Sequence, residues 1–164
     1  MENLQIRRAA EEQAEEILRL YQSLVGSPGC SWTENYPAIE DVMEDIQTKS
    51  LYVVLSTGGK LIAAAAAGGN IDGLKHLTFW SKEIKTPCDL ARIGVLRAQQ
   101  GRGIAGTLLR YVERDAAARG FDGMRLLVSP QNSRALALYH AAGYQKRGEA
   151  CLYERNWFCC EKAL

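Results

Sequence analysis

The chain has 164 residues, of which 47% are hydrophobic and 24% are charged. This composition fits one globular domain over residues 1–164 and excludes a disordered or fibrous chain. Because the formal net charge is only +1, we expect neither nucleic acid nor a membrane surface as a partner. The longest apolar run, Leu61 to Ala67, is too short to cross a bilayer and is expected in the core.

The start of the chain lacks the apolar stretch of a signal peptide and soon turns acidic, with Glu11 and Glu12 followed by Glu15 and Glu16. We therefore expect a cytoplasmic protein. The five cysteines include no Cys-x-x-Cys pair, and there are only two histidines. This pattern predicts reduced core cysteines, with neither a disulfide framework nor a metal site.

Hydrophobic periodicity predicts the order β-α-α-β-β-β-α-β-α-β-β. Glycines and prolines break the pattern between Val25 and Pro37 and predict a loop there. Gly68 to Pro87 is polar, irregular and longer than most connections, which is typical of a functional segment. The expected strands are Leu4–Arg8, Leu51–Leu55, Leu61–Ala67, Leu90–Leu96, Met124–Val128, Tyr144–Gly148 and Cys151–Cys160, and the expected helices are 14–24, 39–46, 104–116 and 135–142.

The segment from Gln100 to Gly106 joins a predicted strand to a predicted helix and reads Gln-Gly-Arg-Gly-Ile-Ala-Gly. Free backbone N–H groups at the positive end of a helix bind phosphate, and glycines let the ligand approach the backbone closely. We interpret the segment as a pyrophosphate cradle, with an ordinary glycine-rich turn as the alternative. The glycines also satisfy G-x-G-x-x-G, but they do not follow the strand directly, which disfavours a Rossmann site. No Gly-Lys-Ser/Thr follows, so a Walker loop is excluded.

Two patterns, in the right order, resemble signatures of the GNAT N-acetyltransferase family. The first is Gln100-x-x-Gly103-x-Ala105. The second consists of Asn132, Ala135, Leu138, Tyr139, Gly143 and Tyr144, at the spacing Asn-x-x-Ala-x-x-Leu-Tyr-x-x-x-Gly-Phe/Tyr. The resemblance implies an α/β (α+β) fold, with a mixed, mostly antiparallel twisted sheet of about seven strands flanked by about four helices. It also implies acetyl-coenzyme A as the acetyl donor.

The same resemblance implies roles for individual residues. Asn132 matches a position that hydrogen-bonds the cofactor, and Tyr139 matches a tyrosine that protonates the departing thiolate. The strand residues Ile93, Gly94 and Val95 match those that pair with the pantetheine arm. The residues expected around the pyrophosphate are Gln100, Gly101, Arg102, Gly103, Ile104, Ala105 and Gly106.

General chemistry supports part of this assignment. A phenol with a pKa of about 10 can give a proton to a thiolate whose parent thiol has a pKa near 8.5. Asn132 and Tyr139 are seven residues apart, which places them on one face of a helix. A helix N-cap is the alternative for Asn132, which could also serve both roles, and a core aromatic is the alternative for Tyr139.

An amine attacks a thioester only when it is neutral, so the enzyme must either bind the free base or remove a proton, usually with a carboxylate that reaches it through water. Asp89 is the candidate, and a solvated carboxylate at a strand end is the alternative interpretation. Glu34 and Glu83 are weaker candidates.

The acceptor is expected to be a primary amine of a small molecule that attacks directly in a ternary complex. Trp32 and Tyr36, in the loop Val25 to Pro37, are expected to form one wall of its site, although they could instead fix the loop to the core. A protein or peptide amine is one alternative, and a catalytically silent acyl-coenzyme A sensor is another. Relatives that acetylate ribosomal-protein N-termini carry Glu where Leu127 stands, which disfavours a peptide N-terminus. The oligomeric state stays open, with a homodimer as one alternative.

Overall fold

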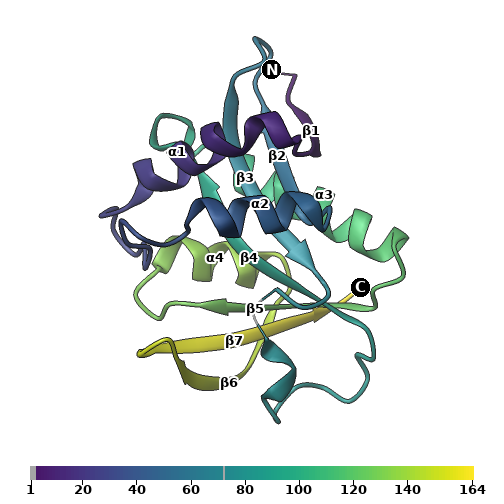
Figure 1. Cartoon of the computed structure of the whole chain (residues 1–164). Helices are drawn as coiled ribbons and strands as arrows, with labels where there is room; N and C mark the ends of the chain where they lie inside the picture. Colours follow the sequence, from purple (N-terminus) through teal and green to yellow (C-terminus); the bar gives the residue numbers. More distant parts are fainter. Residues whose placement is uncertain (1–2, 72) are drawn as a thin grey trace.

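The computed structural model describes residues 3–71 and 73–164. The strands of this part of the chain form one twisted sheet (Figure 1). The predicted order of strands and helices is confirmed. The elements are β1 Gln5–Arg8, α1 Ala14–Leu24, α2 Ile39–Gln47, β2 Leu51–Leu55, β3 Leu61–Gly68, β4 Pro87–Val95, α3 Ile104–Ala118, β5 Gly123–Val128, α4 Ser133–Ala141, β6 Gln145–Leu152 and β7 Arg155–Ala163.

The strands of the sheet lie in the order β1-β2-β3-β4-β5-β7-β6. All neighbouring pairs are antiparallel except β4 and β5, which are parallel because α3 connects them across one face. Within residues 3–71 and 73–164, the predicted mixed, mostly antiparallel sheet of seven strands is therefore confirmed, together with its four flanking α-helices.

Two hydrophobic clusters hold the helices against opposite faces of this sheet. Ile17 and Tyr21 of α1 pack with Val53 of β2 on one face, in the cluster that also contains α2. Leu108 and Val112 of α3 pack on the other face, in the cluster that includes α4. Figure 1 shows α1 and α2 crossing the upper part of the sheet on the same side.

The alanine run of β3 forms a fully buried strand in spite of the low strand propensity of alanine. Ala64 and Ala66 pack toward α1, whereas Ala63 and Ala65 belong to the cluster around α3. Because both faces of β3 are covered, small side chains let helices approach from each side. Tertiary packing thus decides the conformation of this segment.

The last two strands extend beyond their predicted limits. We expected a break after Gly148, but Gly148 lies inside β6 and the hairpin turn is at Tyr153 and Glu154. A Cβ on Gly148 would lie 2.4 Å from the ring of Phe79, so this glycine makes room for an aromatic side chain of the β3–β4 loop. At the other end of the loop, β4 begins at Pro87 rather than at Leu90.

None of the described helices is both long enough and apolar enough to span a membrane.

The clusters make a direct stability prediction for α3. Leu108 is fully buried, so Leu108→Ala should lower the free energy of unfolding by about 2–5 kcal/mol through lost transfer energy and the cavity left behind. Arg114, on the exposed side of the same helix, supplies the control: Arg114→Ala should change stability by less than about 0.5 kcal/mol. Urea unfolding followed by circular dichroism measures both values. Equal losses would contradict the assignment of faces.

Candidate functional site

The central feature of the site is the parting of β4 and β5. Their parallel pairing runs only from Pro87 opposite Gly123 to Leu90 opposite Leu126. Beyond these pairs β4 continues to Val95, and β5 continues to Val128 with its pairing directed to β7. The backbone edge of residues 91–95 that faces β5 is therefore left without a strand partner, and a wedge opens between the two strands.

A β-bulge in β4 coincides with this opening. Ala66 pairs with Ala91 and Ala64 pairs with Gly94, so β4 uses one more residue than β3 over the same stretch. Arg92 lies in the bulge with φ of 51°, in the left-handed region that is uncommon for residues other than glycine. A bulge bends its strand and increases the local twist, and here it occurs where β4 leaves β5.

The start of α3 contributes hydrogen-bond donors beside the wedge. Gly101 and Gly103 have φ of 79° and 78°, and a Cβ at either position would meet no atom within 4 Å. The first helical amides, from Ile104 onward, have no acceptor one turn earlier in the helix. The first turn also contains no acidic side chain. Open space, free amides and the positive end of the helix dipole together suit a phosphate group.

Two side-chain hydrogen bonds of Gln100 fix the loop before α3. Its Nε2 donates to the Val95 carbonyl at 3.0 Å, and its Oε1 accepts from Arg134 Nη1 at 2.6 Å. Gln100 thus links the end of β4 to the first turn of α4. Its backbone, together with the exposed Arg102 side chain, lies next to the free amides.

Asn132 is the N-cap of α4, because its Oδ1 accepts a hydrogen bond from the Ala135 amide at 3.1 Å. The prediction that Asn132 and Tyr139 share a helical face needs correction, since Asn132 precedes the first helical residue. A Cβ on Gly29 would lie 2.9 Å from the Asn132 Cα. The loop between α1 and α2 therefore touches the start of α4.

Tyr139 lies in α4 with 6% of its surface exposed. It belongs to the hydrophobic cluster that includes Val95 of β4 and Val128 of β5, the two arms of the wedge. Its ring meets that of Tyr144 edge to face at a centroid distance of 5.5 Å. Burial, with a smaller effect of Cys160, raises the pKa of Tyr139 well above its ordinary value. The phenol therefore keeps its proton at any pH used in an assay.

Asp89 lies within β4 and is only 2% exposed, so the interpretation of a solvated carboxylate at a strand end is wrong. Its Oδ2 accepts a hydrogen bond from the Ile71 amide at 3.2 Å. In the parallel pair its partner is Arg125, near the narrow end of the wedge. The carboxylate is thus fixed against the β3–β4 loop. By contrast, Glu34 and Glu83 are exposed loop residues.

The two aromatic residues of the α1–α2 loop both contact the bulged strand. The Trp32 ring lies edge-on to Tyr21 at 5.0 Å, and a Cβ on Gly94 would be 3.1 Å from Trp32. The Tyr36 hydroxyl accepts a hydrogen bond from Arg92 Nη1 at 3.1 Å, while 41% of the Tyr36 surface is exposed. Trp32 therefore fixes the loop to β4. Tyr36 also contacts β4, through Arg92, but its side chain stays partly exposed to solvent.

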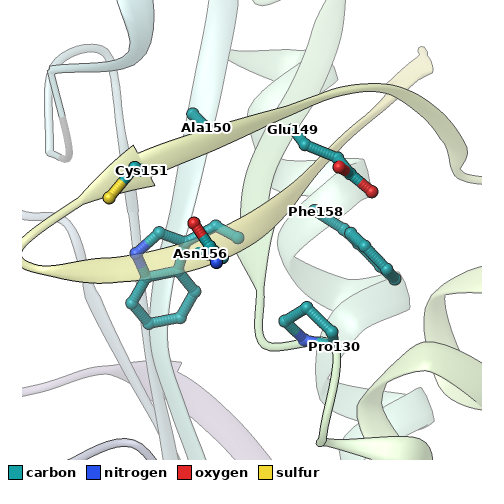
Figure 2. Close-up of a pocket in the computed structure, with 7 residues that line it drawn as sticks. Pro130, Glu149, Ala150, Cys151, Asn156 and Phe158 are labelled. Atoms are coloured by element: carbon teal, nitrogen blue, oxygen red, sulfur yellow. The ribbon is translucent and has the colours of Figure 1, made fainter.

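A pocket of about 340 Å³ lies at the free end of the β6–β7 hairpin. Figure 2 shows Phe158 of β7 extending toward the loop that carries Pro130, two residues before Asn132. The lining residues are Pro130, Glu149, Ala150, Cys151, Asn156, Trp157 and Phe158. Glu149 also pairs with Lys146 at 2.7 Å, but both side chains are exposed, so this ion pair contributes little energy.

Sequence reasoning missed the ion pair between Arg92 and Asp45. Arg92 Nε and Nη2 donate to the two carboxylate oxygens of Asp45 at 2.9 and 2.7 Å, and the side chains are only 8% and 5% exposed. Burial works to lower the pKa of Arg92, but the hydrogen bonds and charge of Asp45 raise it above its ordinary value. No local pattern marks two residues 47 positions apart as partners.

Comparison with known proteins decides the family. A family model described as the acetyltransferase (GNAT) family matches residues 13–144. The chain belongs to the GNAT acetyltransferase family. The predicted family is thereby confirmed.

This GNAT chain is similar to N-acetyltransferase 8 of Mus musculus, with 31% identity over 121 residues that cover 70% of the chain and 50% of the relative. It thus spans about half the length of the curated relatives that it matches. A GNAT acetyltransferase of Streptococcus agalactiae has the same fold, with a TM-score of 0.82, 20% identity and coverage of 98% and 95%. The yncA protein of Salmonella typhimurium, solved with its cofactor acetyl-coenzyme A, gives a TM-score of 0.74, 18% identity and coverage of 99% and 94%.

The amide-rich start of α3 makes a binding prediction for this GNAT domain. Gly103→Val places a β-branched residue at a φ of 78° and disturbs the free amides. It should therefore weaken acetyl-coenzyme A binding at least about tenfold, which is ~1.4 kcal/mol.

Gly59 in the β2–β3 turn supplies a matched control, with φ of 81° and equally open space around a Cβ. Gly59→Val should introduce similar strain while leaving the dissociation constant unchanged. Isothermal titration calorimetry measures both variants. An unchanged affinity in Gly103→Val would remove the loop from the cofactor site.

Proposed function

We propose that this protein transfers an acetyl group from acetyl-coenzyme A to the primary amine of a small molecule, by direct attack in a ternary complex. The observation that carries the proposal is the open edge of β4 beside the free amides of α3. A strand edge offers alternating donors and acceptors to an amide-containing arm, and the helix start offers donors to phosphate. These are the two chemical groups that coenzyme A presents.

The residues that would hold the cofactor follow from this geometry. The backbone of Ile93, Gly94 and Val95 would pair with pantetheine, and the amides of Gly101 to Gly106 would bind the pyrophosphate. Asn132, already the cap of α4, would offer its side-chain amide to the cofactor. When bound, the cofactor supplies the activated thioester and its acetyl group.

Tyr139 would act as the proton donor for the departing thiolate. Its phenol stays protonated because burial raises its pKa. It belongs to the cluster that includes both arms of the wedge, and contact with Tyr144 restricts its ring. A positioned general acid of this kind typically contributes ~10²- to 10⁴-fold to the rate.

Asp89 would receive the proton of the attacking amine through water. It lies on β4 shortly before the bulge and is held by the Ile71 amide. A fixed carboxylate keeps one orientation, as a general base requires.

The pocket at the end of the β6–β7 hairpin supports a small acceptor. Its volume of about 340 Å³ is in the range of sites for small molecules. Trp157 and Phe158 line it with aromatic surface. The ammonium group of Lys146 already pairs with Glu149 and lies 3.8 Å from the centroid of the Phe158 ring, so these two groups serve a cation of the chain itself. Pro130 places this pocket beside the loop that leads to Asn132.

A thiol-release screen tests the function. The protein and acetyl-coenzyme A would be incubated with amino acids, polyamines, aminoglycosides and short peptides with free N-termini, and free thiol would be recorded. Release with a small amine supports the proposal. Release only with peptides would establish a peptide acetyltransferase, whereas cofactor binding in calorimetry without release for any acceptor would establish a sensor.

The role of Tyr139 predicts a selective kinetic effect. Tyr139→Phe removes an interaction made mainly in the transition state, so kcat should fall by ~10²- to 10⁴-fold with little change in the KM for acetyl-coenzyme A. Tyr111, an exposed tyrosine on α3, provides the control, since Tyr111→Phe should leave both constants unchanged. Near-normal turnover of Tyr139→Phe would show that water protonates the thiolate.

The role of Asp89 predicts a distinct pH profile. If it relays a proton from the amine, Asp89→Asn should slow the reaction most at low pH, where the amine is protonated. Raising the pH should restore part of the rate, because the neutral amine then needs no base. Glu83→Gln should leave the profile unchanged. A loss of equal size at every pH would assign Asp89 to binding or structure.

A further inference from the structure

Arg92 joins three parts of the site through one residue. Its backbone forms the bulge of β4, with φ of 51°. Two of its side-chain nitrogens bind the carboxylate of Asp45 in α2, and a third donates to the Tyr36 hydroxyl in the α1–α2 loop. The proposed cofactor strand β4, helix α2 and the α1–α2 loop, which the sequence predicts to form one wall of the acceptor site and which is called the acceptor loop below, therefore meet at one guanidinium group.

The buried ion pair between Arg92 and Asp45 fixes the relative orientation of β4 and α2 more than it stabilises the fold. Burying two charges costs desolvation energy, and well-packed apolar residues often stabilise a fold equally well. A planar guanidinium held by two parallel bonds to a carboxylate, however, permits one relative orientation of the groups. Because the pair is nearly fully buried, this orientation is also protected from water.

The position of the bulge explains why this orientation matters. The last pair between β4 and β5 is Leu90 with Leu126, and Arg92 follows two residues later. Gly94, two residues further on, lies against Leu24 and Trp32, since a Cβ there would be 2.8 and 3.1 Å from them. The segment between these fixed points contains the unpaired edge of the wedge. Its path thus depends on how Arg92 is held.

We propose that Arg92 is a positioning residue whose ion pair with Asp45 sets the path of β4 along the cofactor wedge and whose bond to Tyr36 aligns the acceptor loop with that strand. The proposal rests on the proposed function, which assigns the wedge beside β4 to acetyl-coenzyme A, and on the prediction that the α1–α2 loop lines the acceptor site. Arg92 acts through the backbone of Ile93 to Val95 and through Tyr36. It needs no contact with the reacting atoms.

The first test replaces the pair in a way that keeps the fold. Arg92→Met combined with Asp45→Leu removes both charges, whereas a single substitution would leave one buried charge without its partner. In the protein without cofactor, the amides of residues 93–95 should exchange hydrogen at least about tenfold faster, while those of β2 stay unchanged. The affinity for acetyl-coenzyme A in calorimetry should fall at least about tenfold.

Arg8→Met is the matched control, because it removes another ion pair with the same N–O distance of 2.7 Å, at Asp115 of α3. Neither the exchange at residues 93–95 nor the affinity should change in this variant. A double variant that melts near the wild-type temperature and keeps both the exchange rates and the affinity would overturn the proposal. A lower melting temperature with both values kept would also overturn it, because it would assign the pair to stability alone.

The second test addresses the loop. Tyr36→Phe deletes only the hydroxyl that accepts from Arg92, so the amides of Thr33 and Tyr36, which bond to each other's carbonyls, should exchange at least about tenfold faster. Tyr21→Phe is its control. The Tyr21 hydroxyl is fully buried and has no partner within the described part of the chain, so its removal should leave the loop unchanged. Unaltered exchange in Tyr36→Phe would refute the link between Arg92 and the loop.

The readouts separate this inference from the proposed function. If the wild-type protein fails to bind acetyl-coenzyme A, the proposed function fails. The exchange rates of residues 93–95 and of the loop, measured without cofactor, still decide whether Arg92 holds these segments in place.

Discussion

The ending of the hydrogen bonds between β4 and β5 is the constraint on which the rest of the site depends. Paired strands lie about 4.8 Å apart and leave no room for a ligand. Once the pairing stops at Leu90 and Leu126, the amides and carbonyls of β4 need other partners. A parallel pair can part in this way because each strand keeps an antiparallel neighbour, β3 for β4 and β7 for β5. The sheet thus opens in its middle without exposing either strand on both edges.

The helices follow from the same opening. The connection from β4 to β5 passes through α3, whose first turn therefore starts beside the diverging end of β4. The connection from β5 to β6 passes through α4, whose N-cap Asn132 follows the end of β5, the other arm, by four residues. A Cβ on Gly106 would be 3.7 Å from Leu138, so α3 and α4 pack closely next to the wedge. The first turn of a helix carries free N–H groups. The starts of two helices, α3 and α4, lie at one end of the wedge between β4 and β5.

The parts of the structure that could be predicted from sequence are those with local signals. Periodicity located all seven strands and four helices, and the glycines around Arg102 marked the start of α3 because left-handed backbone there needs them. The N-cap at Asn132 was also a local signal. Contacts between residues far apart in sequence could not be predicted. The Arg92–Asp45 ion pair forms only when β4 and α2 come together, and Asp89 becomes buried only when the sheet is assembled. The predicted end of a strand at Gly148 was wrong for the same reason. The ring of Phe79, which this glycine accommodates, lies in a loop far away in the sequence.

The burial of Tyr139 bears on its strength in the proposed role of general acid. A phenol whose pKa is raised would seem a poor donor to a thiolate whose parent thiol has a pKa near 8.5. Desolvation, however, penalises every anion in the same pocket, so it raises the pKa of the thiol as well as that of the phenol. The transfer then depends on the difference between the two, about 1.5 units for the unperturbed groups, or roughly 2 kcal/mol. A barrier term of this size is small beside the cost of expelling an unprotonated thiolate into an apolar site. In the proposed role, burial therefore leaves Tyr139 about as able to protonate the thiolate as an unburied phenol would be, while it makes a thiolate that stays unprotonated more costly.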